Sequence, residues 1–246
     1  MILIFIRHGD PRRDSYSLTE KGLTQSRMLG NYFSNKTISK IFSAPSTRAR
    51  ETTTSFLEAL GDTSKKVKVD YVEWLNEFKH PIQLPNGNTQ FAWEIPLDLW
   101  CMNHNMLNLS TCMDQSLYAS GNIKKYATEV WNSFDMLMHD VGYDRVGGRY
   151  DVIKGNKDTY LFITHFATIS VLLSHILNIP LPVMLHFFWQ APSGFTTLRS
   201  EEMEQGKAIF RCVAYNETTH LLSSTNEDVM SFYGLKRECY NHTEVL

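Results

Sequence analysis

The feature that most constrains the fold is a pair of apolar runs, each followed closely by a histidine. Residues 2–6 read Ile-Leu-Ile-Phe-Ile and lead into Arg7-His8, and residues 160–164 read Tyr-Leu-Phe-Ile-Thr and lead into His165. Continuous, β-branched runs of this length are typical of strands buried on both faces of a parallel sheet. The sequence therefore predicts two central strands that end in titratable side chains.

Helical and strand-like segments alternate along the chain. Apolar spacing predicts helices at about 20–33, 47–60, 116–139 and 166–177, short strands at 40–43 and 67–72, and a late hairpin of strands at 194–199 and 208–214. Thr19 and Ser46 are predicted to cap the first two helices, and the polar stretch 142–158 is predicted to be a loop. This alternation predicts an α/β fold, a three-layer α/β/α sandwich around a mostly parallel central sheet.

Length and composition set the class of protein. The 246 residues carry 24 basic and 26 acidic side chains, a net charge of 24 − 26 = −2 with neutral histidines, and they are expected to form one domain. No global basic field favours nucleic acid, and no apolar run reaches the about 18 residues that a membrane-spanning helix needs. The four cysteines form no CxxC pair and the start lacks a basic leader, which predicts free thiols and a cytoplasmic protein.

Charged and titratable residues gather where predicted strands end. Arg7 and His8 follow the first strand, Arg48 follows the second, Glu77 comes shortly after the third, and His165 follows the fourth. The carboxyl ends of parallel strands meet at one edge of a sheet, so we expect these five side chains to converge. A single Arg-His pair at a strand end is more often structural, and the convergence carries the argument.

Such a set of side chains suits phosphoryl transfer. Arginine guanidinium groups hold phosphoryl oxygens by bidentate hydrogen bonds, and a neutral histidine can act as a covalent nucleophile. A glutamic acid can protonate the leaving oxygen. A metal-dependent hydrolase would need clustered metal ligands such as His-x-His pairs, which the sequence lacks. The residues therefore predict a metal-free site.

The spacing of these residues resembles that of the histidine phosphatase superfamily, which contains the cofactor-dependent phosphoglycerate mutases and many small-molecule phosphatases. Five motifs carry the resemblance in the same order: Arg7-His8-Gly9, Leu18-Thr19-Glu20-Lys21-Gly22-x-x-Gln25, Ser43-Ala44-Pro45-x-x-Arg48-Ala49-x-x-Thr52, Leu75-x-Glu77 and Thr164-His165. A later segment, Thr219-His220-Leu221, is similar to a common motif of the family.

The resemblance implies a role for each site residue. His8 attacks phosphorus and becomes phosphohistidine, and its other ring nitrogen is expected to donate to a backbone carbonyl. Arg7, Arg48 and His165 hold the phosphoryl oxygens, and Glu77 protonates the leaving group. No cofactor and no metal are implied. The expected partner is a small phosphate ester rather than a nucleic acid or a membrane, and a homodimer is left open.

Three departures from the mutases favour a phosphomonoester hydrolase. Asp14 stands where the mutases carry an asparagine that touches phosphate, Phe166 replaces the usual glycine after His165, and the mutase motif after Glu77 is missing. Asp14 and Phe166 are therefore candidate substrate-binding residues. Mutase-type transfer and a non-catalytic interaction module remain the alternatives, and retention of all five site residues argues against the second.

The segment 79–115 is rich in aromatic residues and has few charged ones, so we expect a lid over the site. Its lack of cations gives a mutase little with which to bind a substrate carboxylate. An apolar or aromatic leaving group stacked near Trp93 or Trp100 is one expectation, and simple packing of the segment is the other. Arg12 and Arg13 either contact a second anionic group or form a solvated loop.

Overall fold

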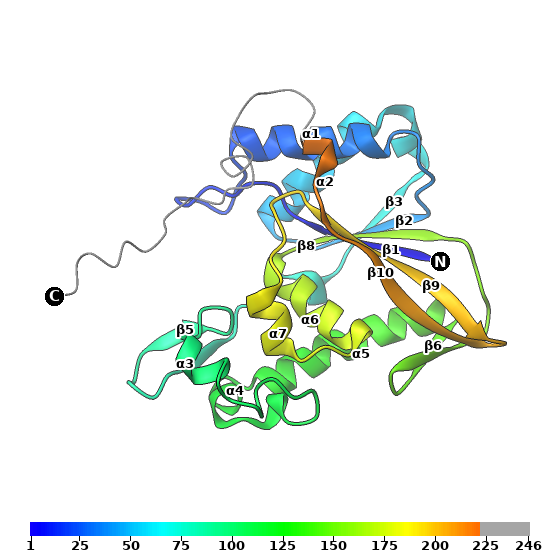
Figure 1. Cartoon of the computed structure of the whole chain (residues 1–246). Coiled ribbons are helices and arrows are strands. Elements are labelled where there is room, and N and C mark those ends of the chain that lie inside the picture. Colours follow the sequence, from blue (N-terminus) through cyan, green and yellow to red (C-terminus); the bar gives the residue numbers. More distant parts are fainter. Residues whose placement is uncertain (222–246) are drawn as a thin grey trace.

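The computed structural model describes residues 1–221. A sheet of eight strands lies at its centre in the order β3-β2-β8-β1-β9-β10-β7-β6 (Figure 1). Four neighbouring strands run parallel: β3 (Lys68–Tyr71), β2 (Lys40–Ser43), β8 (Thr159–Thr164) and β1 (Ile2–Arg7). The other four pair antiparallel: β9 (Phe195–Glu204), β10 (Lys207–Glu217), β7 (Arg149–Val152) and β6 (Tyr143–Val146).

Helices cover both faces of this sheet, as the sequence predicts (Figure 1). One face carries α1 (Glu20–Phe33) and α2 (Thr47–Leu60), and the other carries α5 (Ile123–Asp140), α6 (Phe166–Leu177) and α7 (Leu181–Phe187). The predicted three-layer α/β/α sandwich is confirmed. The late hairpin, β9 and β10, is confirmed as well, and it lies antiparallel to β1 at the end of the parallel half.

The register of β1 and β8 positions the site. Arg7 pairs with Thr164 at the carboxyl ends of the two strands, and the His8 N–H donates to the Thr164 carbonyl at 2.9 Å. Apolar side chains on both faces hold this pair of strands, with the rings of Phe5 and Phe162 stacked at 4.9 Å between centroids. The register therefore brings the residues that follow the two strands side by side.

Residues 142–158 were predicted to be a loop, and this was wrong. They contain the hairpin of β6 and β7, which turns at Gly147 with a φ of +60°, a backbone conformation that favours glycine. Tyr143 and Tyr150 are buried and pack against Phe210, so the hairpin extends the hydrophobic core. The strands are short and rich in charged residues, which hides the alternation that a buried face normally produces.

The helix predicted over 116–139 is in fact two helices, α4 (Ser116–Ser120) and α5. The chain turns at Gly121-Asn122, where Asn122 has a left-handed φ of +52°. Gly121 packs so closely on the Pro81 carbonyl that a Cβ would lie 2.5 Å from its oxygen. The break is therefore caused by contact with the preceding segment rather than by local helix propensity.

The segment 79–115 folds into a small hairpin and short helices. It contains β4 (Pro81–Gln83), β5 (Thr89–Phe91) and α3 (Leu97–Trp100), which pack with α4 and with one side of α6 and α7 as a second hydrophobic cluster. Trp100 is only 2% exposed, and its ring stacks on His186 at 4.2 Å. The expectation that Trp100 contacts a leaving group is therefore wrong, because packing covers its ring. Trp93 is half-buried and stacks on Phe91.

The described residues also bear on the expected free thiols and on the expected lack of a membrane-spanning helix. Cys101, Cys112 and Cys212 are free thiols, and Cys239 lies outside the described residues. None of the described helices has the length and apolar character to cross a bilayer.

Candidate active site

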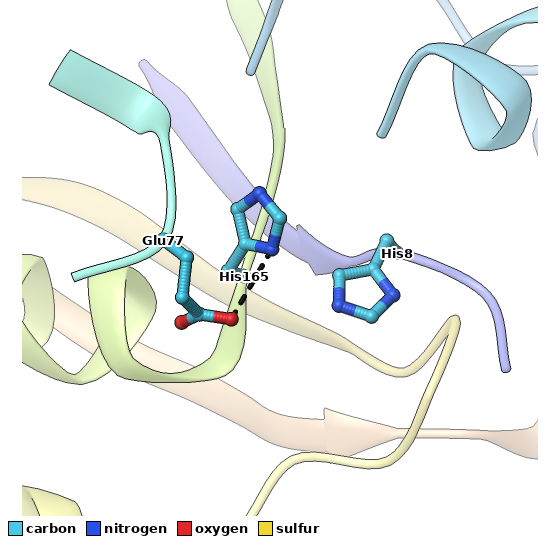
Figure 2. A group of neighbouring side chains, drawn as sticks. All are labelled: His8, Glu77 and His165. Carbon is cyan, nitrogen blue, oxygen red and sulfur yellow. Dashed lines mark ion pairs between the residues drawn. The ribbon is translucent and has the colours of Figure 1, made fainter. Parts of the chain in front are cut away.

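Three side chains from distant parts of the sequence surround one space at the carboxyl edge of the parallel strands. His8 follows β1, His165 follows β8, and Glu77 extends from the loop after β3 (Figure 2). One nitrogen or carboxylate oxygen of each lies within 4.8 Å of the other two. Both histidines are almost fully buried, at 2% and 1% exposure. The predicted convergence of strand ends therefore occurs.

His8 presents one ring nitrogen to this space. Its Nδ1 lies 2.7 Å from the Gly9 carbonyl oxygen, which can accept a hydrogen bond but cannot donate one. Nδ1 therefore carries the hydrogen, and Nε2 holds the lone pair. Nε2 lies on the side of the ring that faces Glu77 and His165 (Figure 2). Burial, together with the nearby His165, Arg7 and Arg48, lowers the pKa of His8 well below its ordinary value of 6.5. The ring is therefore neutral and nucleophilic at neutral pH.

The loop after β1 needs a glycine beside the histidine. A Cβ on Gly9 would lie 2.5 Å from the Gly22 carbonyl oxygen of α1, so any other residue would push the helix away. The Gly9 N–H donates to the Thr52 hydroxyl at 3.0 Å, and that hydroxyl donates to the Arg48 carbonyl at 2.7 Å. The backbone around His8 is therefore tied to the first turns of α1 and α2.

Arg7 is the first of two cations in the site. Its Nη1 donates to the Gln190 carbonyl at 2.7 Å, while its Nε is buried and has no hydrogen-bond partner within residues 1–221. Burial lowers the pKa of Arg7 to about 10, and the nearby Glu77 opposes this change. The guanidinium therefore stays charged and keeps an unused donor, which suits an oxyanion.

Arg48 and Ser46 approach the site from the start of α2. Arg48 Nη2 lies 3.4 Å from Glu77 Oε2 as an ion pair. Ser46 was predicted to cap α2, but its side chain makes no capping bond. Its hydroxyl is instead 2.9 Å from His165 Nε2. The tertiary contact with the histidine thus replaces the local one.

Glu77 is an ionised carboxylate in the resting site. Burial alone would raise the pKa of Glu77. The nearby His165, Arg48 and Arg7 lower it by more than burial raises it, so the pKa of Glu77 lies below its ordinary value. Its Oε2 lies 3.3 Å from His165 Nδ1 at an angle unsuited to a hydrogen bond, and its Oε1 accepts from the Ala167 N–H at 3.3 Å. The carboxylate therefore offsets part of the positive charge of Arg7 and Arg48.

Two threonines to which the sequence analysis gave no role position Glu77. The Thr168 hydroxyl donates to the Asn76 carbonyl at 2.6 Å and accepts from the Phe78 N–H at 3.0 Å. The Thr164 hydroxyl donates to the Leu75 carbonyl. Both threonines are fully buried. Buried hydroxyls one residue before and three residues after His165 were the signal, and the apolar surroundings concealed it.

We expect Thr168→Val to destabilise the fold and to lower activity. The change keeps the shape of the side chain but leaves the Phe78 N–H and the Asn76 carbonyl unsatisfied in a buried place, which costs about 1–3 kcal/mol for such a group. Urea unfolding measures the loss, and Thr168→Ser, which keeps the hydroxyl, should recover most of it. Equal stability of the valine variant and the native protein would contradict the positioning role.

The remaining candidates divide into one inside the site and one outside it. Phe166 is half-buried, and its ring centroid lies 5.7 Å from the Arg7 guanidinium carbon. Asp14 is exposed on the loop between α1 and β1, and no contact joins it to the site residues in the described part of the chain. On the same loop Arg13 is exposed, and Arg12 donates to the Leu18 carbonyl at 3.1 Å.

The arrangement favours an anionic ligand. Two guanidinium groups and one carboxylate leave an excess of positive charge next to the neutral His8 ring. His8, Glu77 and His165 also lie close enough together to hold a metal ion, but the neighbouring Arg7 and Arg48 oppose a second cation there. A tetrahedral phosphoryl group matches the charge and the donors better.

Comparison with known proteins finds a family match in the N-terminal part of the chain. Residues 3–81 match the model of the histidine phosphatase superfamily, branch 1. The resemblance to the histidine phosphatases is confirmed. The matched part holds Arg7, His8, Arg48 and Glu77, and no curated protein sequence matches the chain significantly.

Several solved structures share the fold at low sequence identity. A phosphoserine phosphatase from Entamoeba histolytica is 20% identical with a TM-score of 0.54, and the alignment covers 89% of this chain and 98% of that one. Mycobacterial glucosyl-3-phosphoglycerate phosphatase is 15% identical with a TM-score of 0.54, over 87% and 98% of the chains. YhfR of Bacillus stearothermophilus is 18% identical with a TM-score of 0.54, over 89% and 98%.

The late motif has a packing role in the described structure. His220 is buried against Tyr32 and Phe195, and burial lowers its pKa to about 4. It therefore joins the end of the described chain to α1 and β9 rather than to the phosphoryl site.

Proposed function

We propose that this protein is a phosphomonoester hydrolase that acts on a small phosphorylated substrate through a phosphohistidine intermediate and without a metal. The observation that carries the proposal is the neutral Nε2 of His8, which faces a space bordered by cations and by one carboxylate. The N-terminal family match and the phosphatase activities named for the structural neighbours support the same reaction class.

In the first step, the Nε2 lone pair of His8 attacks phosphorus while the bond to the ester oxygen breaks. The electron pair of that bond goes to the leaving oxygen, which takes a proton from Glu77. The Nδ1 hydrogen stays on its bond to the Gly9 carbonyl, which stabilises the positive charge that develops on the ring. Arg7 and Arg48 offset the charge of the transferring oxygens.

Glu77 must gain a proton before it can act as an acid. In the resting site its charge is held by Arg48 and His165. A phosphoryl group bound to the same partners would take over these contacts and add negative charge beside the carboxylate, which raises the pKa of Glu77. The carboxylate left after the first step then removes a proton from water, which attacks phosphorus and releases phosphate from His8.

Hydrolysis of an aryl phosphate at about pH 6, with a chelator present throughout, tests the proposal. The depressed pKa of His8 keeps the nucleophile unprotonated at this pH, so turnover should continue. Chelator should leave the rate unchanged, because the phosphoryl contacts come from side chains. Complete loss in chelator that a divalent metal restores would disprove the metal-free mechanism.

We expect Glu77→Gln to slow poor leaving groups far more than good ones. Glutamine keeps the shape of the side chain but cannot supply a proton, and such catalysis contributes about 10²–10⁴-fold where the leaving oxygen needs it. The rates of alkyl and nitrophenyl phosphates in native and variant protein measure the difference. Equal slowing of both substrates would remove Glu77 from the acid role.

A further inference from the structure

Two aromatic rings lie close to the Arg7 guanidinium. The centroid of the Phe166 ring is 5.7 Å from its central carbon, and that of the Trp189 ring is 5.9 Å away. Both side chains are half-buried, as is Arg7, whereas His8 and His165 are almost fully buried. Apolar surface is therefore left uncovered next to the phosphoryl-binding cation.

The place of Phe166 relates this surface to the leaving group. Phe166 is the first residue of α6, and the N–H of the next residue, Ala167, contacts Glu77 Oε1 at 3.3 Å. The carboxylate that is proposed to protonate the leaving oxygen thus lies against the turn that carries the phenyl ring. A leaving group protonated by Glu77 would therefore lie near the start of α6, where Phe166 stands.

Trp189 is held in place by its neighbour. Gln190 is buried, and its side-chain amide donates to the Phe5 carbonyl at 3.0 Å and to the Gly194 carbonyl at 2.8 Å. It also accepts from the Thr196 hydroxyl at 2.8 Å, while its backbone carbonyl accepts from Arg7. The chain that carries the indole is therefore anchored to β1 and to the start of β9 in the central sheet.

We propose that Phe166 and Trp189 form a subsite for the leaving group and that they select phosphate esters with a flat, uncharged ring near the ester oxygen. This inference rests on the proposed phosphatase function. A planar ring can stack on both aromatic side chains and cover their exposed surface. A positively charged leaving group would be repelled by Arg7, and a strongly hydrated one would lose solvent against apolar rings.

Benzyl phosphate and cyclohexylmethyl phosphate provide a matched test. Both release a primary alcohol with a similar body size, so the ratio of their kcat/KM values isolates ring planarity from leaving-group acidity. Aromatic contacts contribute about 0.5–1.5 kcal/mol, so we expect the native protein to favour the benzyl ester about 3- to 10-fold. Phosphoserine, with a charged body, should be hydrolysed less efficiently than either ester.

Variants assign the preference to the two rings. Phe166→Leu and Trp189→Leu should each bring the ratio close to one, and Phe166→Tyr and Trp189→Phe should restore most of it. Phe187→Leu is the matched control, because Phe187 is 66% exposed, lies two residues before Trp189 in the chain and packs on Trp100 rather than on Arg7. Thermal unfolding of each variant separates loss of the subsite from loss of the fold.

Three outcomes distinguish this subsite from the proposed function. A benzyl preference that disappears only in the Phe166 and Trp189 variants supports the subsite. Hydrolysis of all esters with no preference in the native protein overturns the subsite and leaves the phosphatase function standing. If no ester is hydrolysed, inhibitor binding decides: benzylphosphonate that binds no more tightly than methylphosphonate, measured by calorimetry, overturns the subsite as well.

Discussion

Replacing His8 with alanine is expected to abolish phosphate-ester hydrolysis, with a loss of at least about 10³-fold in kcat. The variant keeps Arg7 and Arg48 but has no lone pair to attack phosphorus, so only residual stabilisation by the cations remains. The native protein, quenched in mid-turnover, should carry acid-labile phosphate on one histidine, and His8→Ala should carry none. Rapid quenching with radiolabelled substrate, followed by acid and base treatment, measures this intermediate.

A surface histidine supplies the control for this variant. His139 on α5 is paired with Asp144 on β6, the edge strand farthest from β1 on that side of the sheet, so His139→Ala should keep full activity and full phosphoenzyme. His8→Ala also removes a buried ring, so circular dichroism and a thermal midpoint should accompany the rates. A folded His8→Ala protein with native turnover would exclude the phosphohistidine mechanism.

We expect Arg48→Ala to lower kcat/KM by about 10²–10³-fold, the range found when one donor to a developing oxyanion is removed. The change removes a cation from the phosphoryl oxygens and also the partner of Glu77, whose pKa should rise toward its ordinary range. Because Glu77 must be protonated to act as the acid, the basic limb of the pH–rate profile should shift to higher pH in the variant, which a simple loss of folding would not produce.

Arg50 is the matched control for Arg48. It lies on the same helix two residues away, is exposed, and packs its guanidinium on the Tyr71 ring at 3.9 Å, outside the site. Arg50→Ala should therefore leave kcat/KM within about twofold of the native value, in keeping with a surface substitution. An equal loss in the Arg48 and Arg50 variants would show that the charge of α2 as a whole, and not one contact, supports catalysis.

Local patterns in the sequence were sufficient for the centre of the fold and for the strand ends at which His8 and His165 lie close together. The apolar runs before His8 and His165 form adjacent strands, β1 and β8, because continuous β-branched residues suit a sheet that is covered on both faces. Parallel pairing then brings the strand ends together, so backbone topology places residues that are far apart in sequence next to one another, whatever the details of side-chain packing. The predicted convergence of His8, Glu77 and His165 follows from this topology alone.

Contacts between distant segments decided the details of the site. The Ser46 hydroxyl binds His165 instead of capping α2, and Thr168 holds the loop of Glu77, because each finds a buried partner that no local pattern reveals. Trp100, which was expected to stack on a leaving group, is covered by the His186 ring. Trp189, which attracted no attention in the sequence, lies beside Arg7.

The division between the two sources of information has a physical reason. Backbone pairing and the burial of apolar faces act along short stretches of chain, so their periodicity is written in consecutive residues. The partner of a single hydroxyl, guanidinium or indole depends on how separate elements pack, and that packing is set by the whole core. The sequence by itself therefore determined which residues could perform the chemistry, and only the tertiary structure decided which side chains hold them in place and which surface a leaving group would meet.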